Sequence, residues 1–148
     1  MNEEPVAELS QQIERDCTRL VLRFAQAVDG GHYDELAELF APEGVFYRPA
    51  EPDCPMRVDA LIDSYRRRLA SIASIHLVTN VLISVKSAAT ALGSTRILFF
   101  GAPREAEIEV GKGRRATLQL VGGFHDRFVR TTHGWRFAER RGEMSFNV

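Results

Sequence analysis

The chain has 148 residues, 45% of them hydrophobic and 26% charged, a composition typical of one globular domain that buries its own core. Its 19 Lys and Arg residues nearly balance its 20 Asp and Glu residues, so no excess of charge points to nucleic acid or an anionic membrane as a partner. Apolar runs all fall short of the roughly 20 residues that a membrane-spanning helix needs.

The start of the chain and the two cysteines argue against further classes of protein. Residues 1–10 are acidic and lack the basic start and apolar centre of a secretion signal, so we expect a cytoplasmic protein. Cys17 and Cys54 have no CxxC spacing and predict neither a zinc site nor a disulfide framework. Nothing in the sequence implies a metal or a cofactor.

The first part of the chain is helical in pattern. Apolar residues recur at steps of three and four over residues 6–28, which predicts an amphipathic helix that ends at Gly30 and Gly31. A second, short helix is expected over residues 33–40.

A strand over residues 45–47 and a proline-rich loop over residues 49–56 follow. A third helix is marked by Leu61, Tyr65, Leu69 and Ile72, and its outer face carries an arginine run that is typical of a solvated surface.

The second half of the chain changes to an apolar period of two. It predicts strands over residues 75–86, 91–101, 116–131 and 135–146, joined by turns in the manner of an antiparallel meander. Helices followed by strands indicate an α+β fold. Three helices packed on one face of a strongly curved, mostly antiparallel sheet would form a cone with a pocket between the two layers.

Five segments of the chain resemble a known family. They are FAQAVDGGHYDEL at 24–36, LFAPEGV at 39–45, IHLVTN at 75–80, GFHDRF at 123–128 and GWRF at 134–137. Together they resemble the SnoaL-like branch of the nuclear transport factor two superfamily, and within it the group of scytalone dehydratase, bile acid dehydratase and hexachlorocyclohexane dehydrochlorinase. The resemblance covers most of the chain and implies one cone-shaped domain over residues 1–148.

The candidate catalytic pair is Asp29 and His76. Asp29 shares a helical line with Leu22 and Ala25 at the margin of the apolar stripe, so its carboxylate is expected to face the interior, although an exposed helix end is the alternative. The negative end of the helix dipole and burial would both raise its pKa unless a group such as histidine compensates. The resemblance implies that His76 faces the pocket, where it would act as a general base oriented by Asp29.

Further candidates would bind the substrate. They are Phe24, Tyr47, Tyr65, Asn80 and Asp126, with plain core packing as the alternative for the aromatic residues. Asn80 shares strand parity with His76. In the strand over residues 116–131, either set of alternating residues can face the pocket, and one set carries Asp126 while the other carries His125. Phe24 stands where bile acid dehydratases have a tyrosine and lacks the hydroxyl that would polarise a substrate carbonyl. Elimination or isomerisation then needs Tyr47, Tyr65 or Asn80 to take over that hydrogen bond.

These residues predict a dehydratase-like lyase acting on a small, mostly apolar, oxygenated or aromatic molecule. The alternatives are an accessory module similar to the small subunit of a ring-hydroxylating dioxygenase, and an isomerase in which a carboxylate is the base. Thr79, Val81, Ile83 and Val85 would leave a second apolar face on the sheet, so we expect a homo-oligomer. The resemblance favours a trimer over a dimer.

Overall fold

The computed structural model describes residues 6–148; residues 1–5, part of the acidic segment noted above, lie outside the described range. The helical elements are α1 (Ala7–Gly30), the 3-10 helix η1 (Tyr33–Glu38) and α2 (Val58–Arg68). The strands are β1 (Phe40–Arg48), β2 (Glu51–Arg57), β3 (Ile72–Val85), β4 (Thr90–Pro103), β5 (Leu118–Thr131) and β6 (Gly134–Asn147). None of the described helices is long and apolar enough to cross a membrane.

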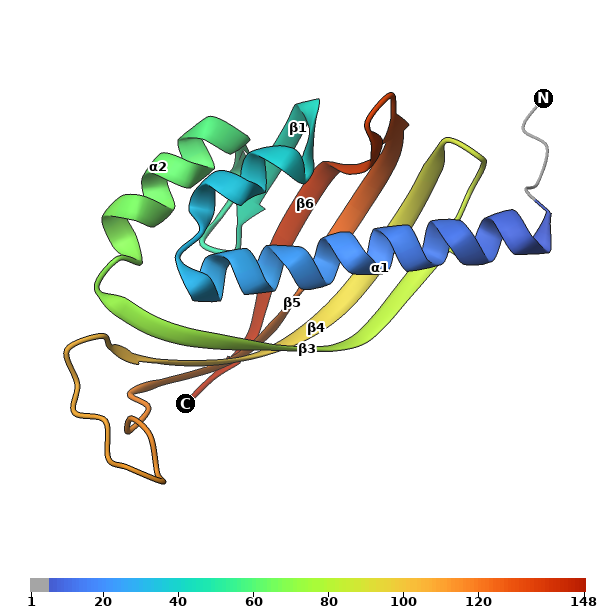
Figure 1. The fold of residues 1–148 in the computed structure, drawn as a ribbon. Helices are drawn as coiled ribbons and strands as arrows, with labels where there is room; N and C mark the ends of the chain where they lie inside the picture. Colours follow the sequence, from blue (N-terminus) through green and yellow to red (C-terminus); the bar gives the residue numbers. More distant parts are fainter. Residues whose placement is uncertain (1–5) are drawn as a thin grey trace.

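The helical elements lie on one side of a curved six-stranded sheet (Figure 1). The strand order is β2-β1-β6-β5-β4-β3, in which β3 to β6 form an antiparallel meander and β1 runs parallel to β6. The sheet is not closed into a barrel. The prediction of an α+β fold with helices on a curved, mostly antiparallel sheet is therefore confirmed.

Helix α1 buries the stripe that its spacing predicted, with Ile13, Cys17, Leu20, Val21 and Phe24 all inside the core. It ends at Gly30 and is capped by Gly31, whose φ of 72° is the left-handed conformation that closes a helix, and the Gly31 N–H faces the Ala27 and Val28 carbonyls. This ending places Asp29 in the last turn.

Several boundaries differ from expectation. The expected loop at residues 49–56 contains strand β2, an exposed edge strand that pairs with β1 alone. Prolines are tolerated there because the outer side of an edge strand needs no hydrogen-bond donors. The second helix stops at Glu38 so that Phe40 can begin β1, and the third helix stops at Arg68 so that Ile72 can begin β3.

Strand β3 contains a bulge that the alternating pattern did not reveal. The pairing with β4 shifts between Thr79 and Leu82, and Asn80 has a φ of 50°. Before the bulge the even residues face the helices, and after it the odd residues Val81, Ile83 and Val85 pack against the core. The prediction that these three residues form an outer apolar face is therefore wrong, because one extra residue reverses the parity of the strand.

Candidate active site

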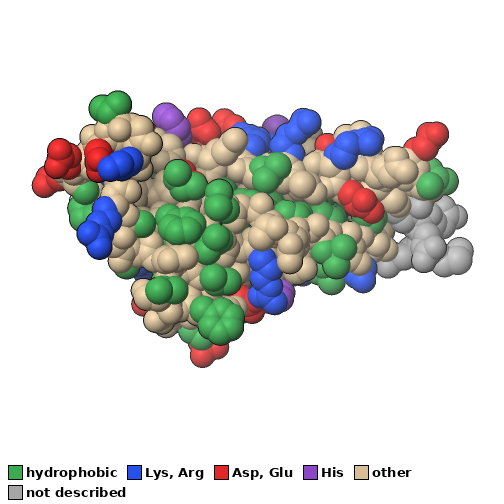
Figure 2. Space-filling model, turned by 90° about the horizontal axis from the view of Figure 1, so that it is seen from below, with side chains coloured by type: hydrophobic (Ala, Val, Ile, Leu, Met, Phe, Trp, Pro, Cys, Tyr) green, Lys and Arg blue, Asp and Glu red, His purple; other side chains and the backbone are tan. Residues whose placement is uncertain are grey.

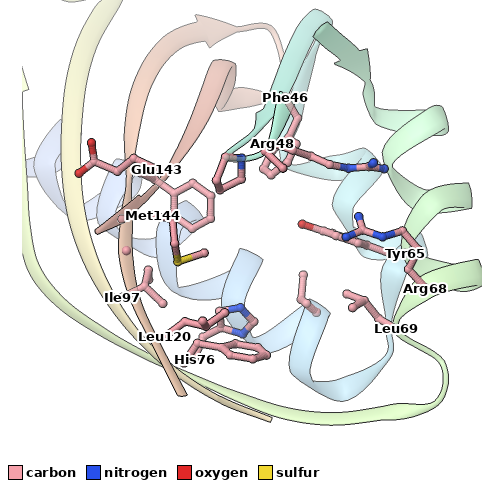
Figure 3. A pocket seen from close by; sticks show the side chains of 17 residues that line it. Phe46, Arg48, Tyr65, Arg68, Leu69, His76, Ile97, Leu120, Glu143 and Met144 are labelled. Carbon is pink, nitrogen blue, oxygen red and sulfur yellow. The ribbon is translucent and has the colours of Figure 1, made fainter. Parts of the chain in front are cut away.

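A cavity of about 300 Å³ lies between the helices and the sheet (Figure 3). Its wall is mostly apolar and includes Val28, Phe46, Leu69, Ile97, Phe99, Leu120, Phe124 and Met144. The polar side chains on this wall are Arg48, Tyr65, Arg68, His76 and Glu143. A hollow of this kind, apolar with a few polar groups, is typical of a small-molecule site.

The last turn of α1 and the start of β3 bring Asp29 and His76 into contact. Asp29 Oδ1 lies 2.6 Å from His76 Nδ1, and Asp29 Oδ2 accepts the backbone N–H of His76 at 2.8 Å. The hydroxyl of Ser74, two residues earlier on the same strand, donates to Asp29 Oδ1 at 2.9 Å. Both side chains are about four-fifths buried.

These hydrogen bonds decide the charge of Asp29. Burial acts to raise its pKa, but the bonds from the side chain and backbone of His76, with that of Ser74, outweigh burial and hold the pKa below the ordinary value. An ionised carboxylate accepts an N–H from His76 Nδ1, which leaves Nε2 as the unprotonated nitrogen of the neutral ring. Nε2 makes no hydrogen bond within residues 6–148, and the ring packs edge-on against Phe99 in the cavity wall.

Of the expected substrate-binding residues, Tyr65 lines the cavity, and its hydroxyl points into it (Figure 3). Tyr47 does not, because it lies on the outer side of β1 under the guanidinium of Arg141, 3.7 Å from the ring centre. Asn80 is exposed at the bulge, where it accepts a hydrogen bond from Thr79. The extra residue of the bulge is what turns Asn80 away from His76.

Phe24 and Asp126 are buried beside the cavity without lining it. Phe24 packs against Phe46 and Phe124, so it supports the wall from behind. Asp126 lies on the inward parity of β5, which answers the question that the sequence left open, and faces Arg140 with 3.5 Å between Oδ1 and Nε. Burial raises the pKa of Asp126 to about 6 even though Arg140 acts to lower it.

Sequence reasoning missed two arginines of the site. Arg68 belongs to the run that was interpreted as a solvated surface, yet it lines the cavity, and so does Arg48 at the end of β1. An exposed helix face predicts charged residues whether or not a cavity opens beside it, so the pattern held no signal that separates Arg68 from its neighbours. Within the described part of the chain, no group of three or more His, Cys, Asp or Glu residues is placed to hold a metal ion.

The comparison with known families identifies the fold. Residues 11–141 match the SnoaL-like domain. The chain belongs to the SnoaL-like family. Among curated proteins, no sequence matches it.

Solved structures share the same fold at low sequence identity. A protein from Novosphingobium aromaticivorans, provisionally identified as a scytalone dehydratase, is similar with a TM-score of 0.79 and 19% identity over 97% of this chain and 91% of that one. The protein Kfla4162 from Kribbella flavida has a TM-score of 0.79 and 17% identity over 94% and 95% of the two chains. A hexachlorocyclohexane dehydrochlorinase, LinA type 2, has a TM-score of 0.73 and 18% identity over 94% and 87%. At these identities the likeness is one of fold.

Proposed function

We propose that this SnoaL-like protein is a cofactor-independent lyase of the dehydratase type, acting on a small, mostly apolar, oxygenated or aromatic molecule. The observation that carries the proposal is the 2.6 Å contact between Asp29 Oδ1 and His76 Nδ1 at the edge of an apolar cavity. The fold it shares with a dehydrochlorinase and a provisional dehydratase is consistent with elimination chemistry.

In the proposed reaction His76 is the general base. Nε2 removes a proton from a substrate carbon, the electrons of that C–H bond form a new C=C bond, and the neighbouring C–O bond breaks with its electron pair on oxygen. The imidazolium then returns the proton to the departing hydroxide, which leaves as water. Asp29 keeps the ring in one tautomer and stabilises its positive charge. The hydroxyl of Tyr65 is the donor that would bind a substrate oxygen in place of the hydroxyl that Phe24 lacks.

The two alternative functions fit the contact less well. An accessory subunit has no need of a carboxylate that holds an imidazole at a cavity edge. An isomerase with a carboxylate base needs a free carboxylate oxygen, whereas both oxygens of Asp29 already accept hydrogen bonds from His76 or Ser74.

We also propose that the protein is a homo-oligomer, and that the outer face of its sheet forms the contact. A row of apolar side chains crosses four strands there, with Leu77 paired to Leu98, Leu98 to Val121 and Val121 to Phe146. Leu77 is 49% exposed and Phe146 is 69% exposed. In Figure 2 hydrophobic side chains gather on the side of the molecule where β3 to β6 converge in Figure 1. Exposed apolar surface of this extent is typical of an interface.

The test of the reaction is turnover of a panel of hydroxy ketones and aromatic alcohols by three variants. His76→Gln should lose about 10²- to 10⁴-fold in rate on any substrate that the wild type dehydrates, because a positioned base contributes that much. Asp29→Asn should lose activity as well, since an amide neither fixes the tautomer nor balances the imidazolium charge. Asp53→Asn makes the same change on an exposed residue and should keep full activity.

Circular dichroism of each variant shows whether it is folded. Wild-type turnover in both folded variants, His76→Gln and Asp29→Asn, would remove the basis of the proposal.

A further inference from the structure

One end of the cavity carries positive charge. Arg48 at the end of β1 and Arg68 at the end of α2 lie on the same side of the cavity as the hydroxyl of Tyr65, and His76 faces them from the other side (Figure 3). The rest of the wall is mostly apolar. Arg68 is exposed to solvent as well as lining the cavity, so its guanidinium stays charged and can pair with a charged group of a bound molecule.

Two of the guanidinium groups near Tyr65 already have counter-charges. Arg48 bonds Glu51 through Nη1 at 3.3 Å and Ser64 through Nη2. Arg140, below the cavity wall, faces Asp126. Arg68 has neither an ion pair nor a hydrogen bond to any residue in the described range.

The one acidic side chain on the cavity wall does not compensate Arg68. The carboxylate of Glu143 points away from the cavity (Figure 3), where it is bound by His125 Nε2 at 3.0 Å and by Arg96. This end of the cavity therefore carries one positive charge, that of Arg68, without a negative partner among the described residues.

Tyr65 supplies a hydrogen-bond donor at the same place. Its hydroxyl makes no hydrogen bond within residues 6–148 and is open to the cavity. Burial raises its pKa to about 12, against the opposing influence of Arg140, Arg48 and Arg68, so the phenol keeps its proton at neutral pH. The guanidinium presents only donors and the phenol hydroxyl can donate one more hydrogen bond, and a carboxylate, which only accepts, matches this set.

We propose that the substrate of this cavity carries a carboxylate, which Arg68 and the hydroxyl of Tyr65 bind at the end of the cavity opposite His76. The inference rests on the proposed function in that it uses the same cavity, and it names the class of substrate. A carboxylate held at this end directs the remainder of a small molecule along the apolar wall toward Nε2 of His76. Arg68 is then a residue that determines specificity.

A structural role for Arg68 makes a different prediction. Positive charges in the last turn of a helix stabilise it through the helix dipole, and Arg66, Arg67 and Arg68 all occupy the last turn of α2. Arg66 also pairs with Asp34. Arg67 shares the helix end and the exposure of Arg68 but is absent from the cavity wall, so it is the matched control.

The test compares the binding of 1-naphthoate and its neutral analogue 1-naphthamide by titration calorimetry. Wild-type protein should bind the naphthoate about tenfold more tightly, since one charge-assisted contact is worth about that factor. Arg68→Met should lose this preference and leave naphthamide binding unchanged, while Arg67→Met should retain it. Raising the salt concentration should weaken naphthoate binding alone.

The outcomes separate this inference from the proposed reaction. Three outcomes would each overturn the carboxylate proposal. They are equal affinity of the wild type for the two probes, an equal loss of the preference for naphthoate in Arg68→Met and Arg67→Met, and no binding of naphthoate. The calorimetry measures binding and not turnover, so a failure of the elimination mechanism in turnover assays leaves the binding result readable.

Discussion

At the scale of single residues, Asp29 shows how a helix end is made to hold a negative charge. The carboxylate lies in the last turn of α1, where the helix dipole and partial burial both oppose ionisation. Hydrogen bonds from Ser74 and His76 reverse that balance. The ionised side chain therefore stabilises the contact between α1 and β3 as well as orienting the imidazole.

This reversal predicts how stability depends on pH. Because the pKa of Asp29 is lowered on folding from its ordinary value of 3.8, its contribution is fully present above that value and is lost as the pH falls through the folded-state pKa. Asp29→Asn should be less stable than the wild type by about 1–2 kcal/mol at pH 6. The difference should shrink below pH 4.

Urea unfolding of both proteins from pH 3 to 7 measures this, with Asp53→Asn as the exposed control. A difference that stays constant over the whole range would contradict the lowered pKa.

At the scale of elements, the bulge in β3 lets one strand serve two purposes. Before Asn80 the inward residues include Ser74 and His76, which meet Asp29. After it, the inward residues are valines and an isoleucine that complete the core. A regular strand would have placed Leu82 in the core and Val81 outside.

The bulge predicts that valine and glycine in place of Asn80 have different effects on the free energy of unfolding. Its φ of 50° is accessible to glycine and asparagine but strained for a β-branched side chain. Asn80→Val should destabilise the protein by about 1–2 kcal/mol. Asn80→Gly should change the free energy of unfolding by less than about 0.5 kcal/mol. Urea unfolding at neutral pH compares the two, and equal stability of the two variants would show that the left-handed conformation is not required.

At the scale of the whole molecule, the two faces of the sheet have different roles. The inner face holds the core and the cavity, and the outer face carries the apolar row from Leu77 to Phe146. Most large exposed apolar patches on folded proteins mark contact sites. The proposed oligomer would cover this row and leave the helical layer free.

The oligomer prediction is tested by sedimentation or light scattering of Leu77→Glu. A charge within an apolar contact is strongly unfavourable, so this variant should shift to a smaller species. Leu22→Glu makes the same change on α1, where Leu22 is 44% exposed against 49% for Leu77, and should keep the wild-type mass. A wild-type protein that is monomeric at micromolar concentration would refute the homo-oligomer, and a measured mass separates a trimer from a dimer.

Local periodicity was enough to predict the helical first half, the antiparallel meander and the α+β class, because steps of three to four and of two report directly on helices and strands. Asp29 and His76 could also be chosen from the sequence, through the helix margin and the family resemblance, and the structure brings them into contact while their catalytic roles stay predictions. Tertiary structure alone decided the rest. The bulge turns Asn80 outward, Tyr47 lies on the outer face of β1, and the end of α2 places Arg68 at the cavity. Each of these depends on how distant segments meet, and a single extra residue in a strand changes every side chain after it.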